Sequence, residues 1–137
     1  MVAVTVVDSN VWIFSSLKEA PEHAAALAKL EQHRNDGLQL NAIIVSETFH
    51  RLSRLVGAIQ SAAHMKRFLA SRFVVYEPLT FETAKVAIEI SLDKQIRIND
   101  AMIAAHALET RQPVLTDNEK DFKKIRGLKV IPLRRVK

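Results

Sequence analysis

The chain of 137 residues contains no cysteine, only 3 glycines and 4 prolines, and no long apolar run. The absence of cysteine excludes disulfides and thiolate metal sites, and it suits a reducing, cytoplasmic setting. No apolar stretch approaches the roughly 18 to 20 residues that span a bilayer, and no basic segment precedes the first apolar run, so we expect neither a membrane span nor a signal peptide. Because repeats and low-complexity linkers are also missing, we predict one compact domain over residues 1–137.

Acidic residues are missing from two segments of a chain whose net charge is +5. Between Thr48 and Tyr76 there are five lysines and arginines but no acid, and after Asp121 there are seven more. Either segment alone is as typical of a basic, solvated helix face as of a phosphate-binding surface. A basic protein with acids clustered at its centre, however, favours a metal-dependent enzyme that acts on a polyanion.

Short apolar segments alternate with helical patterns along the whole chain. Apolar, mostly β-branched runs predict strands at 2–7, 38–40, 73–76, 113–115 and 128–131. Helical spacing predicts helices near 11–14, 21–35, 43–56, 58–71, from 80 onward, 100–110 and 118–124. We expect Ser9 or Asn10 to cap the first helix and Asn99 to cap the helix that starts at Asp100. The alternation indicates an α/β fold with a parallel sheet covered on both faces.

Several carboxylates occur at element ends where they can meet. Asp8 ends the first strand, and Asp117 and Asp121 follow the fourth. If these two strands are neighbours, their loops lie together at the carboxyl edge of the sheet, where α/β proteins bind ligands. Asp100 lies in the first turn of the helix that leads into the fourth strand, and Glu47 lies at the edge of the apolar face of an early helix. We therefore predict a site built from these acids.

Each acid alone also has a purely structural interpretation. A helix cap explains Asp8 equally well, and a favourable interaction with the helix dipole explains Asp100. Glu47 can pair with Arg51 one turn later, and the two acids after the fourth strand can be turn and capping residues. The prediction of a site therefore depends on the convergence of all these acids.

Clustered carboxylates repel one another and raise each other's pKa, which favours a bound divalent cation. Oxygen ligands select hard ions such as Mg²⁺ or Mn²⁺, and the five histidines show no zinc-ligand spacing. The sequence has no phosphate-binding glycine loop, no nucleophile elbow and no Cys–His pair. Ser9 lies beside a carboxylate but lacks a His partner, so we predict that it positions Asp8 or a water.

Four short motifs resemble the successive motifs of PIN-domain nucleases, in the same order and at the same element ends. They are Val6-Val7-Asp8-Ser9-Asn10, Ser46-Glu47, Asn99-Asp100-Ala101-Met102-Ile103-Ala104-Ala105 and Leu115-Thr116-Asp117-Asn118-Glu119-Lys120-Asp121-Phe122. Among these nucleases the chain most resembles the small VapC-type toxins of type II toxin–antitoxin pairs, because the domain fills the chain. The resemblance covers essentially all 137 residues.

The resemblance implies a three-layer α/β/α sandwich with a central parallel sheet of five strands in the order 3-2-1-4-5. It also implies a Mg²⁺- or Mn²⁺-dependent endoribonuclease in which Asp8, Glu47 and Asp100 match the family's acids. For the fourth acid, Asp121 matches the family's later acid and ranks above Asp117, which is offset by one position. The polar supports of this site are Ser9, Asn10, Thr116 and Asn118.

The implied reaction is hydrolysis of an RNA phosphodiester with one or two metals bound by Asp8, Asp100, Glu47 and Asp121. Basic side chains of residues 48–76 would bind the RNA backbone. As a toxin, the protein would form a homodimer and would be inhibited by an antitoxin segment that lies across the early helices. Candidate contacts for that segment, each of which is also a candidate for the core, are Trp12, Phe14 and Leu17.

Other functions remain open on the sequence alone. A housekeeping RNA-processing nuclease would have the same motifs, and a non-catalytic RNA-binding or regulatory module with a vestigial site is a further alternative. Retention of all the acids argues against that module. A haloacid-dehalogenase-like site requires a second Asp where Asn10 stands, and a receiver-like site requires an acidic pair before the first strand ends.

Overall fold

The central sheet consists of five short parallel strands in the spatial order β3-β2-β1-β4-β5. The structure, a computed structural model, describes residues 4–134. Its strands are β1 (Thr5–Val7), β2 (Leu38–Leu40), β3 (Val74–Tyr76), β4 (Val114–Thr116) and β5 (Val130–Pro132). This order confirms the predicted 3-2-1-4-5 sheet. The order reverses between β1 and β4, which creates the crevice in which open α/β sheets bind ligands.

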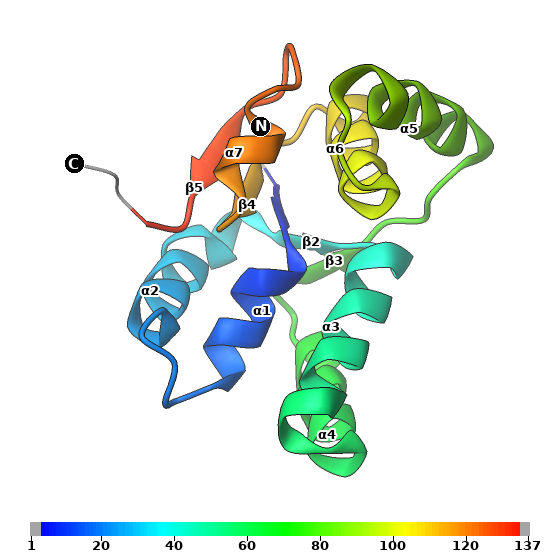
Figure 1. Ribbon diagram of the computed structural model, residues 1–137. Helices are drawn as coiled ribbons and strands as arrows, with labels where there is room; N and C mark the ends of the chain where they lie inside the picture. Colours follow the sequence, from blue (N-terminus) through cyan, green and yellow to red (C-terminus); the bar gives the residue numbers. More distant parts are fainter. Residues whose placement is uncertain (1–3, 135–137) are drawn as a thin grey trace.

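Helices cover both faces of the sheet and complete the predicted three-layer α/β/α sandwich (Figure 1). α5 and α6 pack side by side on one face, and α1, α2 and α4 lie on the other, with α3 packed against α1 and α4. The helices are α1 (Ser9–Ser16), α2 (His23–His33), α3 (Ala42–Val56), α4 (Ala58–Ala70), α5 (Phe81–Lys94), α6 (Ile98–Thr110) and α7 (Glu119–Phe122), with a 3-10 turn at Arg34–Asp36.

The strand β1 is central because its sequence is apolar and uncharged. Val6 and Val7 are fully buried, and they pair with Val114 and Leu115 of β4. The backbone N–H of Asp8 continues this ladder by donating to the carbonyl of Leu115 at 2.9 Å. The register therefore brings the residues that follow β1 and β4 together, as the position of the acids predicted.

Two helix starts near the crevice differ from the predicted ones. The carboxylate of Asp8 caps α1 by accepting from the N–H of Ser9 at 2.8 Å, so the prediction of Ser9 or Asn10 as the cap was wrong. Asp8 takes the cap because its backbone is extended, with ψ of 157°, while Ser9 is already helical. α6 begins at Ile98, two residues before the predicted start at Asp100: Arg97 holds the cap position, and Asn99 lies inside the first turn, so the prediction of Asn99 as the cap was wrong.

Two other helix boundaries concern proline and glycine. α2 begins at His23 rather than at Pro21, which lies in the preceding turn. Gly57 ends α3, as predicted, because its φ of 90° is in the left-handed region that glycine adopts without strain. Its N–H donates to the carbonyl of Ser53, and α4 starts at the next residue.

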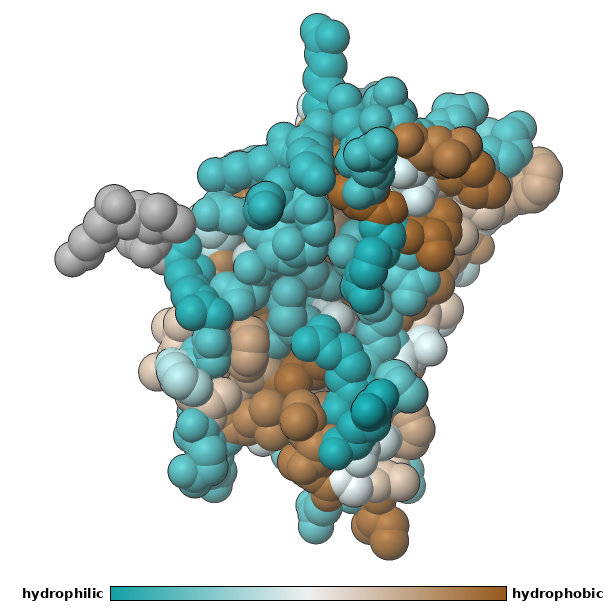
Figure 2. All heavy atoms as spheres, viewed as in Figure 1, coloured by the Kyte–Doolittle hydropathy of each residue, from teal (hydrophilic) through white to brown (hydrophobic). Residues whose placement is uncertain are grey.

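The surface seen in Figure 2 is hydrophilic over α7 and the centre of the molecule, whereas apolar side chains gather over α5 and in the lower half around α1, α3 and α4. The most exposed apolar side chains of α5 are Phe81 at 77%, Ile88 at 53% and Leu92 at 77%. Ile59 at the start of α4 is 85% exposed. Among residues 4–134, no helix combines the length and apolar character needed to cross a bilayer.

Candidate active site

Asp8 stands at the centre of the crevice and is held by three donors. Its side chain accepts hydrogen bonds from the N–H of Ser9, from the hydroxyl of Thr116 at 2.7 Å and from the amide of Asn10 at 3.3 Å. The residue is 3% exposed. The hydroxyl of Thr116 accepts in turn from the N–H of Asn118 at 2.9 Å, so its proton is directed toward Asp8. Strands β1 and β4 thus fix the orientation of this carboxylate.

Asp100 reaches the same crevice from the first turn of α6. It is also 3% exposed, and its Oδ2 accepts from the amide of Asn118 at 3.3 Å. Small residues explain its position: Ala101, Ala104 and Ala105 are fully buried, and their short side chains allow α6 to lie close to the sheet. The burial of α6 therefore carries Asp100 inward.

Glu47 points into the crevice from the second turn of α3. Its carboxylate accepts from the hydroxyl of Ser9 at 3.4 Å, from the amide of Asn99 at 3.3 Å and from the guanidinium of Arg97 at 3.3 Å. Among the described residues it forms no ion pair with Arg51, so the alternative i,i+4 pairing on α3 was wrong. The partners of Glu47 come instead from α1 and α6.

Asp8, Glu47 and Asp100, here termed the inner cluster, offer ligand atoms that all lie within 4.8 Å of one another. Burial raises the pKa of Asp8 from its ordinary value of 3.8 to about 6, and the nearby charges of Asp100 and Glu47 contribute, against the hydrogen bond from Thr116. Burial also raises the pKa of Asp100, against the hydrogen bond and charge of Arg97. Repulsion and desolvation therefore make an added positive charge favourable in the inner cluster.

Asp121 lies at the rim of the same cavity. The cavity has a volume of about 290 Å³ and is lined by Asp8, Ser9, Asn10, Arg51, Arg97, Asp100, Asn118 and Asp121. One amide nitrogen, Nδ2 of Asn118, donates both to Asp100 at 3.3 Å and to Asp121 at 3.1 Å. This hydrogen bond lowers the pKa of Asp121 below its ordinary value. Asn118 therefore links Asp121 to the inner cluster.

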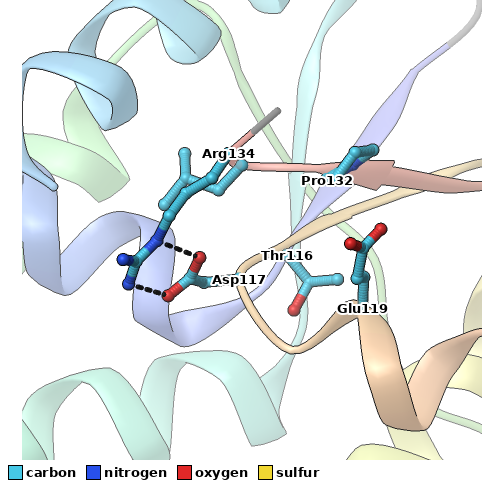
Figure 3. Close-up of a pocket in the computed structure, with 6 residues that line it drawn as sticks. Thr116, Asp117, Glu119, Pro132 and Arg134 are labelled. Carbon is cyan, nitrogen blue, oxygen red and sulfur yellow. Dashed lines mark hydrogen bonds and ion pairs between the residues drawn. The ribbon is translucent and has the colours of Figure 1, made fainter. Parts of the chain in front are cut away.

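Asp117 faces a different cavity, which is shown in Figure 3. Both of its carboxylate oxygens accept from Arg134, at 2.9 and 2.8 Å, and Arg134 also binds Glu22 at 2.6 Å. We term Glu22, Asp117 and Arg134 the outer cluster. The backbone N–H of Asp117 donates to the side chain of Asn10 at 3.1 Å, so the outer cluster adjoins the loop that supports Asp8. The two predicted candidates for a fourth acid thus lie in two separate environments.

A family model of the PIN domain matches residues 5–128. The chain belongs to the PIN domain family. A comparison with curated proteins finds no match.

Several solved structures share the fold of this chain. A structure of VapBC2 from Rickettsia felis bound to a promoter DNA fragment has a TM-score of 0.77 and 18% identity, and the match covers 94% of this chain and 98% of that one. VapC20 from Mycobacterium tuberculosis, a sarcin-ricin loop cleaving toxin, has a TM-score of 0.76 and 20% identity over 93% and 99%. FitAcB from Neisseria gonorrhoeae has a TM-score of 0.73 and 22% identity over 94% and 97%. At these identities the similarity shows a shared fold.

The donors of this PIN domain suit a hard divalent cation. The inner cluster contains only carboxylate oxygens, and no histidine of the described residues belongs to it. Two of its three members are buried, and the pKa of each of these two is raised, as expected for buried acids whose charge is not fully compensated. Carboxylates within ligand distance of one another match the preference of Mg²⁺ and Mn²⁺ for oxygen.

Sequence reasoning missed two side chains that contact Glu47 in this PIN domain. Asn99 was interpreted as a cap, and Arg97 was not singled out at all. The available signal for Arg97 was its position three residues before Asp100, which places both side chains on one helix face. Nothing in the sequence connects either residue with Glu47, about 50 positions earlier, because that contact depends on how α3 and α6 pack.

Proposed function

We propose that this PIN domain is a metal-dependent endoribonuclease and acts as the toxin of a toxin–antitoxin pair. The observation that carries the proposal is the inner cluster, which combines carboxylates from the end of β1, from α3 and from α6 within 4.8 Å at the crevice of the sheet. Buried acids whose charge is only partly neutralised destabilise a fold, so their presence at one point favours a catalytic role over a structural one.

In this proposal Asp8, Glu47 and Asp100 bind Mg²⁺ or Mn²⁺, with Asp121 as the fourth acid. The contact of Asn118 with both Asp100 and Asp121 supports this choice over Asp117. When bound, the cation would lower the pKa of a water and stabilise negative charge that develops on the phosphate. The site would hold one or two such ions.

The polar supports in this mechanism act by orientation. Thr116 and Asn10 hold the carboxylate of Asp8 in a fixed direction, and Ser9 donates to Glu47. A carboxylate that is already oriented does not have to reorganise when the reaction proceeds, and such preorganisation is a major source of catalytic power. Asn118 has the same role for Asp100.

The proposed substrate is RNA, whose phosphates suit the basic character of the chain. Arg51 and Arg97 line the cavity of the inner cluster, where they can contact phosphate groups on either side of the bond that is cleaved. Within the predicted basic segment 48–76, Arg51 lines this cavity, whereas Arg67 lines a separate groove. VapC20, which shares the fold, is described as cleaving the sarcin-ricin loop.

The test of activity uses purified protein, structured RNA and either Mg²⁺ or Mn²⁺. We expect cleavage that requires the cation, stops with EDTA and is lost in Asp8→Asn. Cleavage that survives both EDTA and Asp8→Asn would contradict the proposal. If cleavage is absent from every sample, calorimetric titration with Mn²⁺ distinguishes two explanations. Binding of Mn²⁺ would indicate a catalytic site that acts on another substrate. Absence of binding would indicate a non-catalytic module.

The proposed protein partner is an antitoxin that binds the groove between α1, α2 and α4. Similar structures include VapBC and FitAB assemblies, which supports such a partner. The groove has a volume of about 380 Å³, and its apolar lining residues are Trp12, Leu27, Leu30, Leu38, Phe68 and Val74. Of the predicted contacts, Trp12 lines the groove, whereas Phe14 and Leu17 do not. Trp12 is also 3% exposed and belongs to the core.

Expression with the neighbouring genes tests the toxin role. We expect a small DNA-binding protein, encoded directly upstream, to co-purify with the chain and to inhibit cleavage. An RNA-processing nuclease would cleave the same RNA without such a partner. The toxin role would be contradicted if cells without an inhibitor grow normally while they overexpress the chain, and if the protein purified from these cells cleaves RNA.

We further propose a homodimer, formed through the exposed apolar side chains of α5. Phe81, Ile88 and Leu92 are all more than half exposed, which is unusual for three large apolar residues of one helix. Light scattering is expected to give twice the mass of the chain, and Leu92→Glu to give the monomer mass. A monomer at all concentrations in the unchanged protein would contradict this assembly.

A further inference from the structure

The side chain of Arg97 contacts the inner cluster and does not cap α6. It occupies the N-cap position of α6, with an extended backbone (φ −59°, ψ 145°), and its side chain makes no capping hydrogen bond. The side chain extends across the crevice instead, where one nitrogen, Nη2, lies 3.3 Å from Glu47 and 3.5 Å from Asp100. A single positively charged nitrogen therefore bridges two carboxylates that come from different helices.

The geometry of this contact differs from that of the ion pair between Arg134 and Asp117. Arg134 binds Asp117 through two nitrogens at 2.9 and 2.8 Å, the paired arrangement that suits a guanidinium and a carboxylate. Arg97 uses one nitrogen at longer distances, and its side chain is 69% exposed, whereas those of Glu47 and Asp100 are 10% and 5% exposed. The contact of Arg97 is therefore weak and open to solvent, and a stronger cation can replace it.

The other basic residue of the cavity provides a contrast. Arg51 lines the same cavity as Arg97, but among the described residues it forms no ion pair with an acid of the inner cluster. The two arginines thus contribute the same charge to the cavity, and only one of them contacts the carboxylates that would bind a metal.

We propose that Arg97 is the counter-ion of the inner cluster in the metal-free protein, and that a divalent cation must displace its guanidinium in order to bind. The inference rests on the proposed metal site. It follows from the position of Nη2 beside Glu47 and Asp100, since a cation that uses both carboxylates as ligands competes with this nitrogen for the same two carboxylates. The displaced guanidinium stays at the mouth of the cavity, where a phosphate of the RNA is the anion available to it.

Calorimetric titration of the full chain with Mn²⁺ tests this inference, because it reads out binding rather than activity. We expect Arg97→Gln to bind Mn²⁺ about tenfold more tightly than the unchanged protein. A tenfold change in affinity is on the order of the free energy of two exposed ion pairs, which the cation no longer has to break. Arg51→Gln is the matched control, since it removes the same charge from the same cavity without removing a contact. It is expected to change the affinity less than about twofold, on the order of one screened surface charge.

The outcomes separate this inference from the proposed function. If the unchanged protein binds Mn²⁺ and Arg97→Gln binds it equally or more weakly, the inference is overturned and the metal site stands. An equal gain in both variants also overturns it, because general charge would then explain the effect. If neither the unchanged protein nor Arg97→Gln binds Mn²⁺, both proposals are overturned. Arg97→Lys, which keeps the charge, provides a second variant should Arg97→Gln not fold, and its affinity is expected between those of Arg97→Gln and the unchanged protein.

Discussion

The inner and outer clusters lie at the same edge of the sheet but treat their acids differently. In the outer cluster both oxygens of Asp117 accept from Arg134, and Glu22 binds the same guanidinium. In the inner cluster Asp8 and Asp100 are both 3% exposed, and Arg97 contacts Asp100 and Glu47 through a single nitrogen. A group of acids therefore indicates a metal site when its negative charge is only partly compensated by basic side chains, and not simply when acids are numerous.

The largest expected effect distinguishes the clusters by activity. Asp100→Asn in the inner cluster is expected to lower the rate of RNA cleavage by on the order of 10³-fold, comparable to the removal of a group that stabilises a transition state. Asp117→Asn is the matched change in the outer cluster, and we expect it to keep most of the activity. Single-turnover cleavage with saturating Mn²⁺ measures both. Equal losses in the two variants would mean that the clusters do not differ in function.

The next effect concerns stability of the metal-free protein as a function of pH. Between pH values of about 4 and 6, the folded state retains a proton on Asp8 that the unfolded state has released, so stability falls as the pH rises through this window. The difference between a pKa of 3.8 and one of about 6 lowers the free energy of unfolding by at most about 3 kcal/mol, and this full loss is reached above pH 6.

Asp8→Asn removes this dependence, so its free energy of unfolding is expected to exceed that of the unchanged protein at pH 8, and the gain is expected to vanish at pH 4. Urea unfolding at several pH values, in the presence of EDTA, measures it. Asp93→Asn, at an exposed position, serves as control. A gain for Asp8→Asn that is the same at both pH values would show that the charge of Asp8 is not its cause.

A smaller effect is expected from Thr116, which supports the inner cluster without belonging to it. Thr116→Val removes the 2.7 Å hydrogen bond to Asp8, and loss of a partner that orients a ligand typically weakens metal binding by about 10- to 100-fold. The pKa of Asp8 should rise further, because this hydrogen bond lowers it in the unchanged protein. Mn²⁺ titration measures the affinity. Thr110→Val, which removes a hydroxyl bonded to a helix carbonyl in α6, is expected to bind normally.

The smallest effect is expected in the outer cluster itself. Arg134→Gln breaks the contacts with Asp117 and Glu22, which are exposed to solvent and screened by salt. We expect a small fall in the melting temperature that disappears at high salt, and little change in Mn²⁺ affinity. Arg126→Gln is the control, because Arg126 is exposed and forms no ion pair within residues 4–134. A large loss of metal affinity in Arg134→Gln would show that the outer cluster supports the site.

Most of the fold could be predicted because apolar strands and helical spacing are local signals. The sequence places Asp8 at the end of a central strand, and the sheet order then brings the β4 loop beside it. The choice between Asp121 and Asp117 could not be made in this way. It depends on Arg134, which follows β5 and binds Asp117, and on the single turn of α7 that turns Asp121 toward Asn118. Such contacts arise from packing between distant segments, which periodicity does not report.

The three hydrogen bonds to Asp8 have a consequence for the thermodynamics of ion binding. A free carboxylate rotates, and a ligand that captures it must overcome the loss of that freedom. Here Ser9, Asn10 and Thr116 already fix the side chain in the folded protein. Its rotational entropy is lost when the chain folds, before any ion arrives. Ordering Asp8 therefore opposes folding rather than binding, and an arriving cation meets a ligand that already points in one direction.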